Sequence, residues 1–315
     1  MKHSREWFCG GADMVLEDFG QALERAKATM RTRRVVVAGA ADVHVIDAVL
    51  TAKNLGIAEA ILIGDKAEIS ALLNAHGATA KDFSIIDAPT ALKCGETAVD
   101  QIRVGHADFI MKGMIETRDI LKPLVKKENC LHTGRTMSHV GFFGIPGAKK
   151  LMIITDGGML IAPTLEEKRD IINNAVSLLC NIGYKKPNVA VLCAVETVNP
   201  KMVETTDAQA LVEMNRAGEI PNCTVVGPIS YDLIMSREIA QIKHYDCPHC
   251  GNFDILIAPT MACGNILAKS WILTAGADMA GLIVGAKVPV VLNSRGSSAQ
   301  EKLYSMALAA ISSPE

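Results

Sequence analysis

The chain has 315 residues, a net charge of −2, 49% hydrophobic residues and 21% charged residues. This composition excludes a disordered chain and is typical of a compact globular protein with one large or two ordinary domains. The near-neutral charge and the 4% of aromatic residues argue against nucleic acid or an anionic membrane as a partner.

The nine cysteines are scattered along the chain, and the first residues lack the apolar core of a signal peptide. We therefore expect reduced thiols in a cytoplasmic protein. No apolar run is long enough to span a bilayer, so no membrane association is expected. Cys247 and Cys250 form a lone Cys-x-x-Cys pair. A plain polar loop, a redox pair and a shared metal site all stay open for it, and no metal site is predicted.

The first part of the chain alternates between helical windows and short apolar runs. An amphipathic helix is expected over residues 13–30. Expected strands follow at 35–38, 60–64, 83–87 and 108–113, with helices at 42–55, 66–76 and 90–104. Gly39 is typical of a tight turn after a strand, and the alternative is a backbone amide that touches a phosphate. Repeated βα units of this length predict an α/β fold with mostly parallel sheets and helices on both faces.

Residues 128–150 hold several glycines and Pro146 but few periodic signals, which predicts a crossing between two domains. Arg135, Ser138 and His139 lie in this segment and are candidates to line a cleft. Each also has an ordinary alternative, namely a surface ion pair for Arg135, a turn residue for Ser138 and a hydrogen-bonded core histidine for His139.

The second part of the chain repeats the alternation. Thr164 and Glu167 have the spacing of a capping box at the start of a long helix. Expected strands lie at 151–155, 189–193, 223–227, 253–259 and 281–286, with helices at 206–217 and from 261 onward. Residues 243–252 read as a polar loop.

The final expected strand, residues 288–292, leads directly into Ser294 and Arg295, and Ser297 or Ser298 can cap the helix that follows. Ligands of open α/β sheets bind at the carboxyl ends of strands. Glu301 lies about two turns beyond Ser294, so a hydroxyl, a guanidinium and a carboxylate converge beside a helix N-terminus that favours anions. Lys112 also ends an expected strand and is either an anion ligand or an ordinary exposed lysine.

These stretches together resemble the phosphate acetyltransferase and phosphate butyryltransferase family, and the butyryltransferase branch most closely. The resemblance runs from about residue 30 to the end of the chain. It rests on Ser294-Arg295-Gly296-x-Ser298 with an acidic residue at 301, on Ser138-His139-Val140, on the run 196–202, on Gly227-Pro228-x-x-x-Asp232 and on the run 264–270. Asp156 matches an aspartate of the family, and Lys122 stands where members often carry arginine.

The resemblance implies a two-domain fold of the isocitrate/isopropylmalate-dehydrogenase type. Residues 1–135 plus 290–315 would form the first domain, and residues 136–289 would form a second domain inserted into it. The active site would lie in the cleft between them.

The implied reaction is reversible transfer of a short acyl group, butyryl above others, from acyl-CoA to orthophosphate, giving acyl phosphate and CoA. Arg295 would bind the phosphate, Ser294 would donate to the oxyanion, and Glu301 would exchange a proton with the CoA sulfur. Further substrate-binding residues would be Lys112, Lys122, Arg135, Ser138, Asp156 and Asn265. No cofactor is expected beyond these substrates, and the resemblance implies a homodimer or higher homo-oligomer.

Three other functions stay open. The first is a phosphate acetyltransferase acting on acetyl-CoA. The second is a metal- and NAD-dependent decarboxylating dehydrogenase of the same fold, which the lack of any Asp-x-x-x-Asp in the chain argues against. The third is a sensor that binds CoA or acyl phosphate without catalysis.

Overall fold

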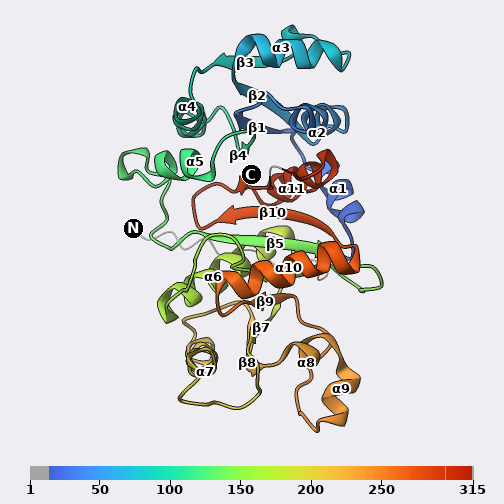
Figure 1. Ribbon diagram of the computed structural model, residues 1–315, viewed down its shortest axis with the longest axis vertical. Coiled ribbons are helices and arrows are strands. Elements are labelled where there is room, and N and C mark those ends of the chain that lie inside the picture. The colour runs from blue at the N-terminus through green and yellow to red at the C-terminus, as the bar shows by residue number, and fades with distance from the viewer. Residues whose placement is uncertain (1–13, 295, 314–315) are drawn as a thin grey trace.

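The computed structural model describes residues 14–294 and 296–313, which contain one continuous 11-stranded sheet. The spatial order of its strands is β3-β2-β1-β4-β11-β10-β5-β6-β9-β7-β8. The strands are β1 (Arg33–Ala38), β2 (Ala58–Gly64), β3 (Ser84–Asp87), β4 (Phe109–Lys112), β5 (Ser138–Gly144), β6 (Met152–Thr155), β7 (Asn188–Leu192), β8 (Thr224–Ile229), β9 (Ile255–Ile257), β10 (Asp278–Val284) and β11 (Val290–Val291). Figure 1 shows this sheet running from the top to the bottom of the molecule.

The sheet is mostly parallel, as the βα repeats predict, but its centre is antiparallel. Strand β10 pairs antiparallel with both β11 and β5, and β5 pairs antiparallel with β6. All other pairs of neighbouring strands are parallel, out to the edge strands β3 and β8. The C-terminal strand β11 therefore returns to lie beside β4, next to the first part of the chain.

Helices follow most strands. They are α1 (Phe19–Lys27), α2 (Val43–Asn54), α3 (Lys66–Ala75), α4 (Ala91–Arg103), α5 (Thr117–Leu124), α6 (Leu165–Ile182), α7 (Val203–Arg216), α8 (Tyr231–Met235), α9 (Arg237–Ile242), α10 (Met261–Ala275) and α11 (Ala299–Ser312), with 3₁₀ turns at Ala80–Asp82 and Lys127–Asn129. Across the described ranges, none of these helices combines the length and the apolar character that crossing a membrane requires.

Side-chain caps decide where several helices begin. The Thr164 hydroxyl and the Glu167 carboxylate form the predicted capping box at the start of α6. The helix predicted over residues 13–30 is shorter, because Asp18 is extended and its carboxylate accepts from the amide of Gln21. Residue 13 lies outside the described residues.

Residues 128–150, which show few periodic signals in the sequence, contain strand β5. It occupies the centre of the sheet and pairs along its whole length with β10. Val140 and Phe142 point into the core, whereas His139, Gly141 and Phe143 point to the opposite face and line a cavity. The cavity-facing positions hold a histidine and a glycine, so the strand lacks a continuous apolar signal.

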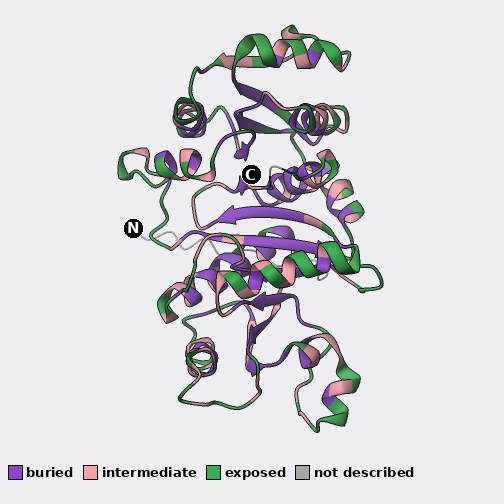
Figure 2. Ribbon diagram, viewed as in Figure 1, coloured by how far each residue is buried: buried purple, intermediate pink, exposed green. Residues whose placement is uncertain are grey.

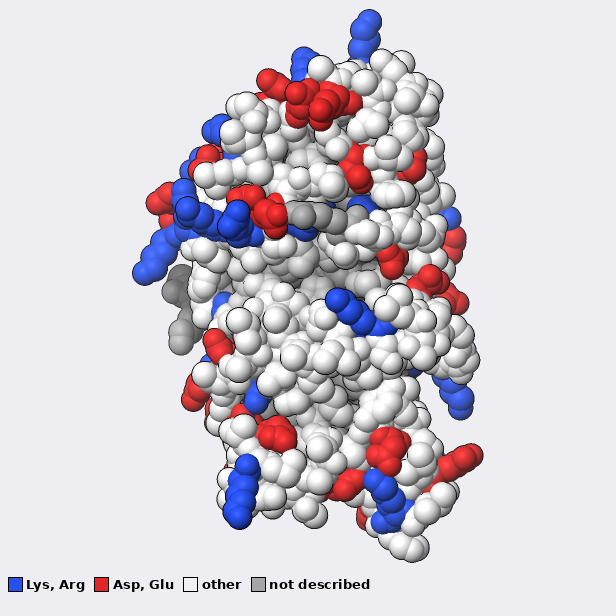
Figure 3. Space-filling view, in the orientation of Figure 1, with Lys and Arg blue, Asp and Glu red and all other residues white. Residues whose placement is uncertain are grey.

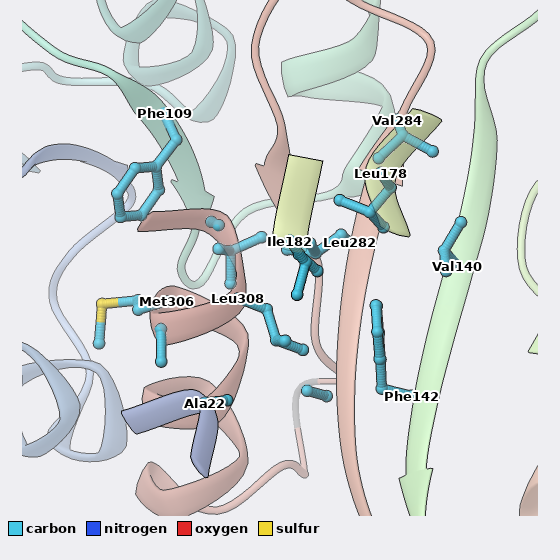
Figure 4. Close-up of a cluster of buried hydrophobic side chains, with 14 of the residues drawn as sticks. Ala22, Phe109, Val140, Phe142, Leu178, Ile182, Leu282, Val284, Met306 and Leu308 are labelled. Carbon is cyan, nitrogen blue, oxygen red and sulfur yellow. The ribbon is translucent and has the colours of Figure 1, made fainter. Parts of the chain in front are cut away.

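One large hydrophobic core covers one face of the whole sheet. It joins α1, α2, α3, α6, α7 and α11 to inward residues of both parts of the sheet. Figure 4 shows its centre, where Phe109 of β4, Met306 and Leu308 of α11, and Leu282 and Phe142 of the antiparallel pair gather. This continuous core ties the C-terminal helix to the centre of the molecule.

The opposite face carries two separate cores. One packs α4 and α5 on the first part of the sheet, and the other packs α8, α9 and α10 on the second part. Strand β1 shows the division of the faces, because Val35 and Val37 join the large core whereas Val36 and Ala38 join the α4–α5 core. Figure 2 shows the buried strands between helices whose outer faces are exposed. The helical layer on this face is thus interrupted in the middle.

We predict that the ion pair between α6 and α7 contributes strongly to stability. Lys168 Nζ lies 2.6 Å from Asp207 Oδ2, and their side chains are 5% and 16% exposed. Replacing Lys168 by Met leaves the carboxylate without its partner and is expected to lower the free energy of unfolding by about 3–5 kcal/mol in urea titration. Lys27→Met is the control, because its pair with Glu24 has a similar length of 2.7 Å but is exposed, so about 1 kcal/mol or less is expected. Equal losses in the two variants would contradict the prediction.

Candidate active site

A cavity of about 750 Å³ lies where the helical layer is interrupted. Its walls come from β4 and the start of α5, from β5, β6 and β10, from α10, and from the segment between β11 and α11. Figure 3 shows a hollow across the middle of this face among mostly uncharged side chains, with a group of Lys and Arg beside it on the left. The polar side chains that line the cavity are Lys112, Glu116, Thr117, His139, Asn265, Lys269, Asn293, Ser294, Ser297 and Glu301.

Lys112 is held at the carboxyl end of β4 by a close backbone packing. Its side chain is 7% exposed, and Nζ donates to the carbonyl oxygens of Gly113 and Ile115 at 3.2 and 3.1 Å. A Cβ on Gly113 would lie 2.0 Å from the carbonyl oxygen of Gly39, so this approach requires glycine. The amides of Gly39 and Ala40 both donate to the Ile63 carbonyl, which assigns Gly39 to the tight turn rather than to a phosphate contact.

The segment after β11 brings Ser294 and Glu301 to the same cavity, as the spacing of the sequence predicts. Ser294 is exposed, and its carbonyl accepts from the amide of Ser297 in a tight turn. Ser298 caps α11 in a capping box, in which its own amide donates to Glu301 Oε2 at 2.9 Å. Among the described residues Oε1 of Glu301 accepts no hydrogen bond. Arg295 lies outside the described residues.

Two side chains of α11, Ser305 and Lys302, hold the segment between β11 and α11 in place. The Ser305 hydroxyl accepts from the Gly281 amide and from Asn293 Nδ2, each at 3.0 Å, which joins β10 to the end of β11. Lys302 is only 4% exposed and donates to the Ser297 carbonyl at 2.5 Å. Burial lowers the pKa of Lys302, while Asp42 and Glu301 oppose this shift. These contacts hold the loop that carries Ser294.

A second turn, after β6, forms the opposite wall. Asp156 is 1% exposed, and its carboxylate accepts from the amides of His139, Gly158 and Met159 at 2.8, 2.6 and 2.7 Å. Asn265, near the start of α10, donates to the Gly157 carbonyl at 3.1 Å. Asp156 therefore positions this wall from inside, and Asn265 lines the cavity itself.

His139 lines the cavity from β5 and is half-buried. Burial lowers the pKa of its imidazole, and the nearby Asp156 carboxylate opposes this shift. Among the described residues neither ring nitrogen has a hydrogen-bond partner. The ring is therefore not the hydrogen-bonded core histidine that the sequence leaves open as an alternative.

Three other predicted binding residues lie elsewhere. Lys122 is exposed in the last turn of α5 and does not line the cavity. Arg135 lines a separate cavity of about 230 Å³ and donates to the Ser177 hydroxyl at 3.3 Å. Ser138 is fully buried and accepts from Asn174 Nδ2 at 3.1 Å. These contacts place Arg135 and Ser138 beside the amino-terminal end of β5.

The loop between α9 and β9 carries the two cysteines of the Cys-x-x-Cys pair as free thiols. Burial, followed by the neighbouring Cys247, raises the pKa of Cys250 to about 11. Within residues 14–294 and 296–313, no three His, Cys, Asp or Glu side chains gather in an arrangement that could hold a metal ion.

The sequence reasoning missed two charged groups at the cavity, Glu116 before α5 and Lys269 on α10. A signal existed for Lys269, because the Lys-Ser pair lies in the run 264–270 that carries the family resemblance. Glu116 follows Lys112 by one tight turn, and only the packing of that turn brings it to the cavity.

The cavity is lined by both polar and apolar side chains. Lys112, Ser294 and Glu301 supply polar groups, and Phe143, Ile154, Ile272 and Met279 supply apolar surface. Cations and helix N-termini can hold an anion, hydroxyl and imidazole groups can hydrogen-bond a carbonyl, and the apolar wall can cover a short hydrocarbon chain. The arrangement suits a substrate with a charged end and an apolar end.

Comparison with known proteins finds a family model and relatives that match most of the chain. The family model described as "Phosphate acetyl/butaryl transferase" matches residues 19–104 and 95–310. The chain is 38% identical to the phosphate butyryltransferase of Clostridium acetobutylicum over 94% of this chain and 98% of the relative. It is 41% identical to the phosphate acetyltransferase of Thermotoga maritima over 89% of this chain and 95% of the relative.

Solved structures agree. A branched-chain phosphotransacylase from Enterococcus faecalis superposes with a TM-score of 0.79 at 31% identity, covering 89% of this chain and 99% of that one. A 4-hydroxythreonine-4-phosphate dehydrogenase from Burkholderia phymatum has a TM-score of 0.55 at 15% identity, covers 91% of this chain and 100% of that one, and shares the fold alone. The matches over nearly the whole chain show that it belongs to the phosphate acetyl/butyryl transferase family.

Proposed function

We propose that the protein transfers a short acyl group reversibly between CoA and orthophosphate, with butyryl-CoA preferred over acetyl-CoA. The observation that carries the proposal is the composition of one cavity. Lys112 ends β4, Asn265 lies on α10, and Ser294 and Glu301 come from the segment after β11. These three segments line the cavity together with apolar side chains. A phosphate, a carbonyl and a short hydrocarbon chain each find suitable groups there.

The roles follow from the charges that the reaction creates. Arg295 neutralises the attacking phosphate, since a guanidinium binds phosphate oxygens bidentately, and Lys112 adds a second cation. The Ser294 hydroxyl donates to the oxyanion of the tetrahedral intermediate. Glu301 exchanges a proton with the CoA sulfur, and its Oε1 faces no partner among the described residues. Both substrates bind together, so the transfer needs no acyl-enzyme.

We extend the proposal to the domain organisation. Residues 1–135 plus 290–315 form one domain and residues 136–289 the other, as in isocitrate/isopropylmalate-dehydrogenase-like folds. Two observations support this division, namely the two separate cores on one face and the cavity that draws its lining from both ranges. The substrates then lie in the cleft between the domains.

Binding roles for Lys122, Arg135, Ser138 and Asp156 stay predictions. None of the four lines the cavity, so any effect of Asp156 on substrate acts through the turn that it holds. A cytoplasmic location, a homodimer or higher homo-oligomer, and activity without a cofactor also stay predictions, supported by the membership in the family.

The test is phosphate-dependent release of free thiol from acetyl-, propionyl-, butyryl- and isobutyryl-CoA. Release that requires phosphate and is fastest with butyryl-CoA is expected. Fastest release from acetyl-CoA would overturn the preference but keep the reaction. CoA binding without release from any of the four would favour a sensor.

Arg295→Ala is expected to lower kcat by about 10²-fold while the Kd of CoA stays within threefold, because the guanidinium acts on the phosphate. Arg295→Lys keeps the charge but loses the bidentate contact, so an intermediate kcat is expected. Steady-state kinetics and calorimetry with CoA measure the two quantities. An unchanged kcat in Arg295→Ala would remove Arg295 from the site.

A further inference from the structure

The imidazole of His139 occupies a space that two glycines, Gly281 and Gly158, keep open. A Cβ on Gly281 would lie 2.9 Å from His139 Nε2, and a Cβ on Gly158 would lie 3.1 Å from Cγ. A Cβ on Gly141 would lie 3.7 Å from Cε1. Contacts shorter than about 3.0–3.4 Å force the neighbour to move, so side chains at Gly281 or Gly158 would displace the ring. The ring position is thus set by packing from β5, β10 and the turn after β6.

The amide of His139 is hydrogen-bonded, whereas its ring nitrogens have no hydrogen-bond partner among the described residues. The backbone of His139 is fixed by its amide, which donates to Asp156 at 2.8 Å. Within the described ranges, neither Nδ1 nor Nε2 has a hydrogen-bond partner, although the ring lines the cavity. Burial lowers the pKa of the imidazole, which favours the neutral ring with one N–H donor.

The ring lies near both Leu292 and Phe143. The space over Gly281 is bounded by His139 Nε2 and, at 2.6 Å, by the carbonyl oxygen of Leu292, two residues before Ser294. A Cβ on Gly141 would lie 3.7 Å from Cε1 of the same ring and 2.8 Å from Cε2 of Phe143, so Phe143 also lies near the ring. Phe143 pairs in register with Met279, so the apolar wall begins there.

The positions of the two ends of the substrate determine which of its groups lies beside the His139 ring. With the phosphate near Ser294 and the hydrocarbon chain against Phe143 and Met279, the atom group between them is the acyl carbonyl. A neutral N–H donor suits a carbonyl oxygen on which negative charge develops, because it is fixed before the reaction and brings no competing charge to the phosphate.

We infer that His139 is a catalytic residue whose Nε2–H donates to the acyl carbonyl oxygen, as a second oxyanion donor beside Ser294. This inference rests on the proposed function. A phosphate oxygen attacks the thioester carbon, the C–O bond forms, and the π electron pair moves to the carbonyl oxygen. The electron pair on that oxygen then re-forms the C=O bond as the C–S bond breaks, and the sulfur leaves with the electron pair of the C–S bond. The proton lost by orthophosphate reaches the sulfur through Glu301, and His139 keeps its own proton throughout.

Two variants separate a donor from a space-filling side chain. His139→Leu fills the space without an N–H and is expected to lower kcat for phosphate-dependent thiol release by about 10²-fold, with the KM of each substrate within threefold. His139→Gln carries an amide N–H at similar reach and is expected to stay within about tenfold of the unchanged protein. Thermal unfolding of both variants checks that they fold.

The outcomes distinguish a failure of the role of His139 from a failure of the proposed function. A Leu variant that folds and keeps kcat within threefold, or that raises only KM, would overturn the role of His139 while the proposed function stands. Absence of thiol release by the unchanged protein would instead overturn the proposed function.

A second measurement uses the unchanged protein and does not depend on folding of a variant. Nitrogen-15 NMR of the His139 ring is recorded with and without 2-oxopentylphosphonate, a stable analogue of butyryl phosphate. A neutral ring protonated at Nε2, whose Nε2–H resonance moves downfield with the analogue, is expected. A ring that is protonated on both nitrogens, or whose resonances do not move when the analogue binds, would overturn the inference.

Discussion

Glu301→Gln lowers kcat by about 10²–10⁴-fold and leaves stability nearly unchanged, if Glu301 exchanges a proton with the CoA sulfur. The structure permits this separation because Glu301 also closes the capping box of α11 with Ser298. Glutamine serves equally at this position of a capping box, so the free energy of unfolding should change by about 1 kcal/mol or less. Steady-state kinetics and urea unfolding measure the two effects.

The matched control is Glu167→Gln, which makes the same change in the capping box of α6 with Thr164. Glu167 does not line the cavity, so kcat should stay within twofold. Equal activity in the two variants would mean that Glu301 has only its structural role.

Asp156→Ala is expected to lower the free energy of unfolding by about 3–5 kcal/mol. The carboxylate is 1% exposed and accepts from the amides of His139, Gly158 and Met159. Removing it leaves buried donors without partners, and hydrogen bonds to a charged group contribute about 1.5–3 kcal/mol each. The turn beside Asn265 is expected to loosen, so kcat should fall as well. Urea unfolding measures the stability.

Asp65→Ala is the control for loss of an aspartate that accepts backbone amides. Asp65 caps α3 and accepts from Ala67 and Glu68, but it is exposed to water. Water can replace its bonds, so a loss of about 1 kcal/mol is expected. A loss for Asp156→Ala no larger than this would contradict the structural role assigned to the turn.

The regular βα units could be predicted from the sequence because their strands are apolar on both faces. Residues 35–38 show this, with Val35 and Val37 in one core and Val36 and Ala38 in another. Strand β5 could not, because one of its faces lines the cavity and carries His139 and Gly141 instead of apolar residues. Its antiparallel pairing with β10 is set by contacts across more than a hundred residues, which no local pattern records.

The site could be predicted where its residues are close in sequence. Ser294 and Glu301 are joined by one strand end and one helix start, so their spacing brings them to one cavity. Arg135, which is distant from both in sequence, precedes β5 and lines a different cavity. The sequence does not indicate that Lys302 supports the loop, because a lysine on an amphipathic helix is usually exposed, whereas Lys302 is 4% exposed.

The most direct test of acyl transfer from CoA to phosphate is phosphorus-31 NMR of the protein with butyryl-CoA and orthophosphate, recorded together with a thiol assay. Growth of an acyl phosphate resonance in equal amount to the free thiol is predicted, since the acyl group moves directly to phosphate. Thiol without acyl phosphate would show hydrolysis instead of transfer and would contradict the account.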